Sequence, residues 1–489
     1  MENYNYKNKD FSRFLVQWLL PIILIVILAG CSEYQKVSED KPNILFIAVD
    51  DLRPELGCYD NTWIQSPNID KLAAEGIVFK RAYCNVPVCG ASRASLLTGL
   101  RPTRDRFLDY KTLAEKEAAG IITIPEHFKN NGYSTISYGK IFHGFEDNKQ
   151  AWDTIWKPDA PNYLTEENLK LNSVEGQRGF PYEHPDVPDS SYKDGLLAIK
   201  TIETLRNLKN NNKPFFMGVG FYKPHLGFNA PKKYWEIYDP IKLNVPEVGF
   251  KPTNAPDEAF HNSGELRKYY GIPKEGFVND TMATKLIHGY SACVSYVDAQ
   301  IGMVLDELKK LGLAENTIIV LWGDHGWNLR EHGMWCKQCN FETSLHVPLI
   351  VKMPGLKARK INDIVEFVDI YPTLCDLTEL PKPMHLEGNT MVDIMKNRDA
   401  KSDGVAISKW FDGVTIITDQ YFYTEWLSDL DSIYARMLFD HNTDQVEMNN
   451  IAEDPKLQSL VDSLSNLQRE HRGKDFWKRV KRERIAVKF

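Results

Sequence analysis

The sequence has no excess of basic residues. Its 489 residues contain 59 Lys and Arg against 66 Asp and Glu, and the formal net charge is −7. Nucleic-acid-binding proteins normally carry a strong basic excess, so nucleic acid is not expected as a partner. Any anionic ligand must instead be met by a local cluster of cations. The hydrophobic fraction, 43%, is that of an ordinary globular protein and excludes a disordered or fibrous chain.

Cysteine pairs with metal-ligand spacing are scarce. Among the eight cysteines, Cys336 and Cys339 have the CxxC spacing of half a zinc site or of a local disulfide. No second CxxC and no His pair accompanies them. A four-ligand zinc site is therefore not expected, and we predict a local structural or redox pair.

The apolar run near the N-terminus is too short for a comfortable membrane span. It extends over residues 14–29, whereas a transmembrane helix needs about 20 apolar residues. Basic residues precede it, and it ends in Leu28-Ala29-Gly30-Cys31, which resembles a bacterial lipobox. We therefore expect a lipoprotein signal peptide over 1–30, lipidation of Cys31, and a polar tether over 31–41. The alternative is an uncleaved signal anchor. The lipobox implies a lipid-anchored protein of the bacterial cell envelope, attached at the outer membrane or the periplasmic face.

Apolar runs in the body of the chain predict buried strands that end in polar residues. Residues 43–49 (NILFIAV) show no polar alternation, as expected for a central strand covered on both faces. Asp50 and Asp51 follow directly. Comparable strands are predicted over 133–138, 215–219 and 317–322, and polar residues follow each of them. Because open α/β sheets bind ligands beyond the carboxyl ends of their strands, these residues predict a site.

Helical patterns alternate with these strands. We predict helices over 68–74, 123–132, 196–208 and 283–311. The alternation predicts an α/β fold over 42–400, with a large, mostly parallel sheet sandwiched by helices. Short β-like runs and a basic terminal helix predict a smaller C-terminal α+β subdomain over 401–489. Residues 149–193 are predicted to form long loops bordering the substrate cleft.

The stretch from Cys89 to Gly99 (CGASRASLLTG) resembles the signature of formylglycine-dependent sulfatases. In that family a maturation enzyme oxidises the cysteine to Cα-formylglycine. Ala91 stands where the family usually has proline, a residue that chiefly restrains the backbone. The resemblance implies the alkaline-phosphatase-like sulfatase fold, a formylglycine at Cys89, and the maturation enzyme as a partner.

Further motifs resemble the iduronate-2-sulfatase branch of this family. They are Asp50-Asp51-Leu52-Arg53-Pro54, Gly139-Lys140-Ile141-Phe142-His143, Lys223-Pro224-His225 and Asp324-His325-Gly326-Trp327. By resemblance, the metal ligands are Asp50, Asp51, Asp324, His325 and the formylglycine at Cys89. Carboxylate oxygens suit a hard cation, and calcium accepts a flexible set of six to eight ligands, so one Ca²⁺ is expected.

The resemblance also implies roles for the remaining polar residues. Arg93 and Lys140 hold the hydrated aldehyde and the sulfate, because both side chains match oxyanions. His143 removes a proton from the spare hydroxyl, whereas His225 and Lys337 serve the leaving oxygen. Trp327 and Lys409 are weaker candidates for holding a substrate carboxylate. Taken singly, each residue is more often a cap, an ion pair or a packing residue, but their order along the chain and the Cys89 motif favour the site.

The expected function is hydrolysis of sulfate esters on a carbohydrate. The branch resemblance indicates a sulfated polysaccharide or oligosaccharide that contains uronate, such as ulvan or a glycosaminoglycan. Two alternatives stay open. One is a phosphatase or phosphodiesterase of the same superfamily, although those enzymes use Ser or Thr and usually two zinc ions. The other is a non-catalytic glycan-binding lipoprotein.

Overall fold

The computed structural model describes residues 41–211, 213–243, 245–246, 251–472 and 476. The predicted signal peptide, Cys31 and nearly all of the tether lie outside the described residues. From Pro42 onward the chain belongs to one compact unit. Across the described ranges, no helix combines the length and the apolar character needed to cross a membrane.

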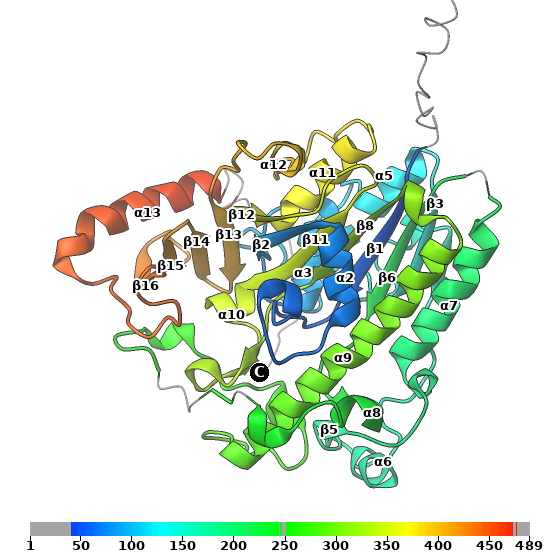
Figure 1. The fold of residues 1–489 in the computed structure, drawn as a ribbon. Helices are drawn as coiled ribbons and strands as arrows, with labels where there is room; N and C mark the ends of the chain where they lie inside the picture. Colours follow the sequence, from blue (N-terminus) through cyan, green and yellow to red (C-terminus); the bar gives the residue numbers. More distant parts are fainter. Residues whose placement is uncertain (1–40, 212, 244, 247–250, 473–475, 477–489) are drawn as a thin grey trace, which may run out of the picture. The chain divides into compact units, whose positions relative to one another are not determined.

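An eight-stranded sheet forms the centre of this unit (Figure 1). Its order is β12-β2-β11-β8-β1-β6-β3-β4. The strands are β1 (Asn43–Val49), β2 (Ile77–Tyr83), β3 (Ser134–Gly139), β4 (Thr154–Trp156), β6 (Phe215–Phe221), β8 (Thr317–Gly323), β11 (His346–Lys352) and β12 (Arg359–Glu366). Only β11 runs antiparallel to its neighbours in this sheet. The predicted mostly parallel sheet is therefore confirmed.

Helices cover both faces of the sheet. Alternate residues of β1 face opposite sides, and every residue of the strand is buried. Leu45, Ile47 and Val49 pack in one core with α2 (Pro67–Glu75), α7 (Lys193–Leu208) and α9 (Asp280–Lys310). Ile44, Phe46 and Ala48 pack in the other core with α3 (Cys89–Thr98), α5 (Ile124–Asn130) and α11 (Ile370–Leu377). This two-faced burial explains the continuous apolar sequence of β1.

A smaller antiparallel sheet follows the main one. Its order is β13 (Ala406–Trp410), β14 (Gly413–Ile417), β15 (Tyr421–Leu427) and β16 (Ile433–Asp440), as the short β-like runs predict. Helix α13 (Gln458–His471) packs on it through Val461 and Leu464. Asn85 joins the two sheets, because its side chain donates to Ile407 O at 2.9 Å and its carbonyl accepts from Lys409 N at 2.9 Å. The strongly basic residues 478–484 of the predicted terminal helix lie outside the described residues.

Residues 149–193 are not the plain loops that the sequence predicts. They contain β4, α6 (Glu166–Asn172) and β5 (Tyr182–Glu183), which pairs with β7 (Phe228–Asn229). These elements are too short to give a sequence period, so pattern analysis misses them. The other short elements are α4 (Ala114–Glu117), α8 (Lys232–Trp235), α10 (Glu342–Leu345), α12 (Val392–Lys396), β9 (Asn328–Leu329) and β10 (Trp335–Cys336).

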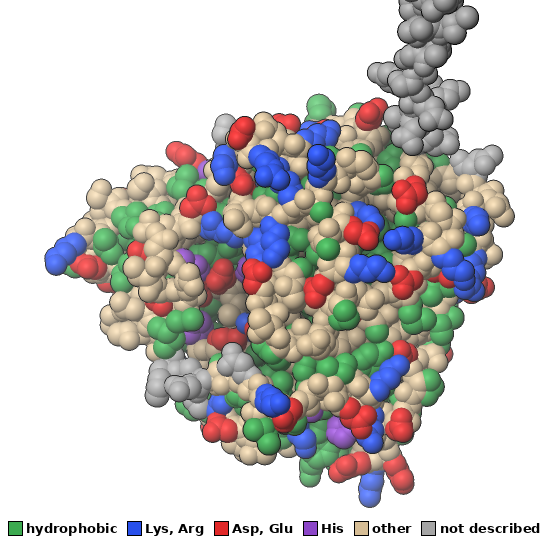
Figure 2. Space-filling view, viewed as in Figure 1, with side chains coloured by type: hydrophobic (Ala, Val, Ile, Leu, Met, Phe, Trp, Pro, Cys, Tyr) green, Lys and Arg blue, Asp and Glu red, His purple; other side chains and the backbone are tan. Residues whose placement is uncertain are grey.

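Basic and acidic side chains are interspersed on the face of the molecule that Figure 2 shows. This agrees with the nearly balanced numbers of acidic and basic residues in the sequence.

Candidate active site

Four adjacent parallel strands, β8, β1, β6 and β3, bring the predicted polar residues to one edge of the sheet. Asp50 and Asp51 follow β1, and Lys140 follows β3. His225 lies shortly after β6, and Asp324 and His325 follow β8. The site thus arises because the carboxyl ends of neighbouring parallel strands meet at the same edge.

Arg93 connects three of these strand ends. It lies one turn into α3 and is fully buried. Its Nε donates to Asp324 Oδ2 at 2.9 Å, and its Nη2 donates to Asp50 Oδ1 at 3.2 Å. Its Nη1 donates to the carbonyls of Lys140 and Ile141. The guanidinium therefore holds both acids in place and reaches the backbone beyond β3.

Lys140 forms the second ion pair of Asp50. Its Nζ donates to Asp50 Oδ2 at 2.6 Å, and both side chains are buried. Burial raises the pKa of Asp50, but Lys140, His225 and Arg93 outweigh it and hold the pKa well below its ordinary value. Asp50 is therefore ionised.

Asp51 is fully buried beside both acids and cations. Lys337 Nζ donates to its Oδ1 at 3.1 Å and its Oδ2 at 3.2 Å. Burial, together with Asp50 and Glu265, raises the pKa of Asp51 to about 8 against the lowering by His225 and Lys337. The carboxylate is thus short of positive charge, as expected at a cation site.

His325 supports the same interpretation. Its Nδ1 lies 2.9 Å from Gly326 O, and a carbonyl only accepts, so Nδ1 carries the hydrogen. Among the described residues its buried Nε2 has no hydrogen-bond partner, and it faces Asp51 Oδ1 at 3.3 Å and Asp324 Oδ1 at 3.7 Å. A nitrogen lone pair opposed by two carboxylate oxygens fits a bound cation between them.

Two groups of possible metal ligands result among the described residues. One joins Cys89, Asp324 and His325, and the other joins Asp50, Asp51 and His225, each with ligand atoms within 4.8 Å of one another. All five predicted metal ligands are therefore in these groups. His225, which the sequence assigns to the leaving group, is an additional member.

Cys89 is the first residue of α3 and is 3% exposed. Burial raises the pKa of its thiol, but the charge of Lys140, the neighbouring His325 ring and the charge of Lys337 together outweigh burial and lower the pKa below its ordinary value. The start of a helix also favours negative charge. A nucleophile formed from this side chain would therefore be stabilised as an anion.

The two histidines of the predicted proton transfers line one cavity of about 460 Å³. Burial, with the nearby Lys140 charge, lowers the pKa of His143 to about 4, so its ring is neutral and can accept a proton. His225 Nδ1 lies 2.6 Å from Leu226 O, and its Nε2 lies 3.1 Å from Glu265 Oε1. Both contacts are satisfied together only by the doubly protonated ring, which can donate a proton.

Glu265 is a site residue that the sequence does not reveal. Its Oε2 also pairs with Lys337 Nζ at 2.9 Å, so it joins the two residues assigned to the leaving group. Burial raises the pKa of Glu265, but Lys337 and His225 hold it well below its ordinary value. Glu265 precedes a single 3₁₀ turn in a region without periodic pattern or motif, so no sequence signal identifies it.

Trp327 and Lys409 do not line this cavity. Trp327 is 1% exposed, and Lys337 Nζ lies 4.7 Å from the centre of its ring. The Trp327 ring therefore packs against the Lys337 ammonium group. Lys409 is buried on β13, where its backbone bonds Asn85.

The Cys336 and Cys339 thiols are both free and buried. Cys339 Sγ lies 3.0 Å from Ser344 Oγ and 3.4 Å from Asn328 Nδ2. The pair is thus packed into the loop that carries Lys337 and has no disulfide.

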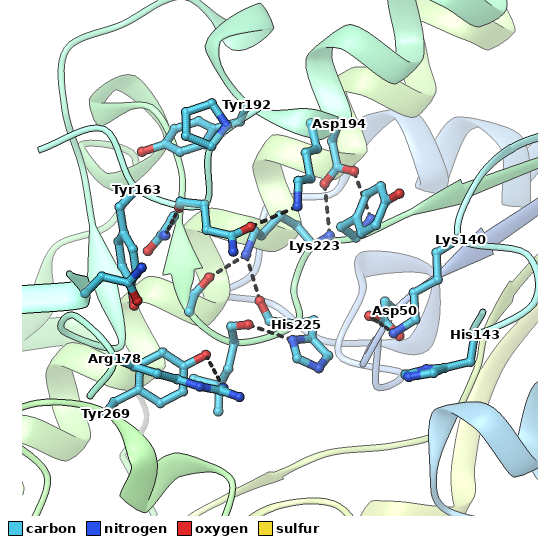
Figure 3. Close-up of a pocket in the computed structure, with 18 of the residues that line it drawn as sticks. Asp50, Lys140, His143, Tyr163, Arg178, Tyr192, Asp194, Lys223, His225 and Tyr269 are labelled. Carbon is cyan, nitrogen blue, oxygen red and sulfur yellow. Dashed lines mark hydrogen bonds and ion pairs between the residues drawn. The ribbon is translucent and has the colours of Figure 1, made fainter. Parts of the chain in front are cut away.

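Figure 3 shows how the residues that line the cavity are arranged. Asp50, Lys140 and His143 lie on one side, and Arg178 and Tyr269 lie on the other. Lys223 and His225 lie between them. The cavity is also lined by residues 161–163, 172, 178, 192 and 193, so the predicted border of the cleft by residues 149–193 agrees with the structure.

Comparison with known proteins agrees with this site. A sulfatase family model matches residues 42–380, and a model of the C-terminal part of N-sulphoglucosamine sulphohydrolase matches residues 330–474. The chain is 34% identical over 389 residues to iduronate 2-sulfatase of Mus musculus, which covers 71% of this chain and 70% of the relative. It is 27% identical over 492 residues to an ulvan-active sulfatase of Formosa agariphila, covering 95% and 88%.

Solved structures show the same fold. A protein in complex with its substrate D-glucosamine-2-N,6-O-disulfate has a TM-score of 0.73 at 22% identity, covering 90% of this chain and 98% of that one. A phosphonate monoester hydrolase of Agrobacterium radiobacter has a TM-score of 0.71 at 21% identity, covering 88% and 96%. The predicted fold class is confirmed, and both the family model and the mouse relative cover most of the sequence. The chain therefore belongs to the sulfatase family.

Proposed function

We propose that the protein removes sulfate from a uronate-containing sulfated carbohydrate, using a formylglycine made from Cys89 and one bound calcium ion. One observation carries the proposal: Cys89 begins α3 beside the strand-end acids and the unpartnered His325 Nε2. Relatives named iduronate 2-sulfatase and ulvan-active sulfatase support the substrate class.

The cation would be held by Asp50, Asp51, Asp324 and His325. Carboxylates in a flexible arrangement favour calcium over magnesium. When bound, calcium supplies positive charge that neutralises sulfate oxygens. Formylglycine supplies, as its hydrate, one hydroxyl to attack sulfur and a second whose deprotonation releases sulfate.

The chain's own side chains supply the remaining chemistry. Lys140 and Lys337 bring positive charge close to Cys89. His143 accepts a proton through its neutral ring, because its pKa is lowered to about 4. His225 donates a proton to the leaving oxygen from its doubly protonated ring. Arg93 holds Asp50 and Asp324 so that these groups converge.

The test combines mass spectrometry with assay of sulfate release. Cys84 and Cys89 lie on one tryptic peptide, residues 82–93, so unmodified Cys84 is an internal control. We expect formylglycine at position 89 alone, and sulfate release from sulfated uronate oligosaccharides that depends on calcium. Unmodified thiol in active protein from a native host would refute the formylglycine. Preferential hydrolysis of phosphonate or phosphate esters would instead establish the phosphatase alternative.

We further propose that the mature protein is attached by a lipid at Cys31 to the bacterial cell envelope. The small residues before Cys31 and the short apolar run support this. Cys31→Ala should prevent incorporation of labelled palmitate and release the protein from the membrane fraction. Retention of label by this variant would contradict the anchor.

A further inference from the structure

The cavity and the residues buried beside it form two groups of different charge balance. The catalytic floor comprises Asp50 and Lys140, which line the cavity, and the buried residues Asp51, Arg93, Asp324, His325 and Lys337. Each Lys or Arg of the floor pairs with a carboxylate. The cavity wall comprises Asn162, Arg178, Lys193 and Lys223. The cations of the floor are neutralised by its own carboxylates, whereas the cations of the wall have different partners.

Each wall cation is held by neutral acceptors. Arg178 Nη1 donates to Tyr269 Oη at 3.2 Å, and Lys193 Nζ donates to Asn162 Oδ1 at 2.8 Å. Lys223 Nζ donates to the carbonyl of His225 at 2.8 Å and to the carbonyl of Gly227. Within the described part of the chain, none of the three forms an ion pair with a carboxylate. Their directions are therefore fixed, while their positive charge is left without an acidic partner.

Asp194, which follows Lys193 in the sequence, already accepts two backbone hydrogen bonds. Asp194 is buried and accepts the backbone N–H of Tyr222 at 2.8 Å and that of Lys223 at 2.9 Å. Burial and the neighbouring charge of Lys223 lower the pKa of Lys193, so these two ammonium groups repel each other. An anion bound between them would relieve this repulsion.

Aromatic side chains complete the wall. Lys193 Nζ lies 5.4 Å from the ring centre of Tyr222, and the Arg178 guanidinium lies 5.1 Å from that of Tyr269. Tyr163 also lines the cavity. Aromatic rings beside fixed cations suit a carbohydrate, because they cover its apolar face while the cations meet its oxyanions.

We infer that Arg178, Lys193 and Lys223 form a second oxyanion subsite, which binds another anionic group of the same carbohydrate. The group is a uronate carboxylate or a second sulfate, since a guanidinium fork and ammonium groups match both. This inference rests on the proposed function, because it assumes that the first sulfate lies over the catalytic floor. It explains how the enzyme selects a dianionic sugar although the molecule carries a negative net charge.

The test compares specificity in Arg178→Gln and in the control Lys170→Gln. Lys170 lies on α6, is exposed and does not line the cavity. Substrates are an aryl sulfate, a sulfated neutral sugar, a sulfated uronate and a disulfated sugar. We expect Arg178→Gln to lower kcat/KM for a dianionic sugar relative to the neutral sugar sulfate by about tenfold, as for loss of one charge-assisted hydrogen bond. Lys170→Gln should leave this ratio unchanged.

The two dianionic substrates distinguish the sources of the anion. A drop confined to the sulfated uronate identifies a carboxylate subsite, and a drop confined to the disulfated sugar identifies a second sulfate. An unchanged ratio for both substrates, in Arg178→Gln and in Lys193→Gln, overturns the subsite. Arg178 is exposed, so its replacement should not prevent folding.

Binding measured without turnover separates this inference from the proposed function. Calorimetry on full-length Cys89→Ala protein, with each sugar as ligand, should show the same tenfold weakening when Arg178→Gln is added. If wild-type protein releases no sulfate from any ester but this weakening is found, the proposed function fails and the subsite stands. If sulfate is released but binding is unchanged by the substitution, only the subsite fails.

Discussion

The catalytic floor and the cavity wall are built in opposite ways. Floor residues extend from the ends of buried strands and from α3, and their charges are paired at 2.6 to 3.2 Å. Arg178 and Lys223 lie in segments between secondary-structure elements, and Lys193 is the first residue of α7. All three bond neutral acceptors. A buried charge requires an oppositely charged partner within the folded protein. A half-exposed charge is stabilised by water and can remain unpaired until a ligand binds. The floor is therefore suited to chemistry and the wall to selection.

Replacing the nucleophile should reduce turnover more than any other substitution. We expect Cys89→Ala to lower kcat by more than about 10⁴-fold on every sulfate ester, because the attacking group is lost. Sulfate release measures this. Cys84→Ala is the matched control, since Cys84 is a buried thiol on the same segment. Near-normal turnover by Cys89→Ala would contradict the proposed mechanism.

Removing one floor acid should separate metal binding from folding. Asp324→Asn keeps the side-chain volume but removes a charge, and we expect calcium affinity and activity to fall together, the latter by roughly 10³-fold. Calorimetry with calcium measures the affinity.

The control for this variant is Asp298→Asn. Asp298 is also a buried acid, but it accepts the backbone N–H groups of Asn68 and Ile69 at the start of α2. Its replacement should lower the melting temperature without changing calcium affinity. Full activity of exhaustively demetallated wild-type protein would exclude the metal.

Glu265 lies where floor and wall meet, and its loss should have an intermediate effect. Glu265→Gln keeps the shape but weakens the bonds to His225 and Lys337, so we expect kcat to fall about tenfold to a hundredfold. The loss should be greater for sugar sulfates than for aryl sulfates, because good leaving groups need no proton. Glu265→Asp should recover part of the activity. Equal losses on both substrate types would show that Glu265 has only a structural role.

The smallest effect is expected for a neutral wall residue. Asn162→Ala removes the acceptor that orients Lys193 but leaves all charges in place. We expect KM for a dianionic sugar to rise about threefold, as for one ordinary hydrogen bond, with kcat unchanged. Steady-state kinetics measure both constants. A change in kcat with constant KM would instead show that Asn162 contributes to catalysis, like the floor residues.

Local sequence was sufficient for the floor. The run 43–49 is apolar throughout because both faces of β1 are covered, and this identifies the strand and hence the place of Asp50 and Asp51. The motif at Cys89 identified the nucleophile by resemblance, but the sequence analysis did not predict the helix α3 that begins there. Parallel strand ends must meet at one edge, so the meeting of the predicted residues follows from the pattern. Strands β2, β4, β11 and β12 were not predicted, although they complete the sheet.

The tertiary structure alone decided which charges meet across long sequence separations. Glu265 joins Lys337 and His225, and Arg178 joins the wall, through segments with no periodicity or motif. The tertiary structure also placed the Trp327 ring against Lys337. Hydrophobic period records which face of a strand or helix is buried, but it contains nothing about where a loop side chain lies. Those positions depend on packing between distant segments, and so the wall became visible only in the folded molecule.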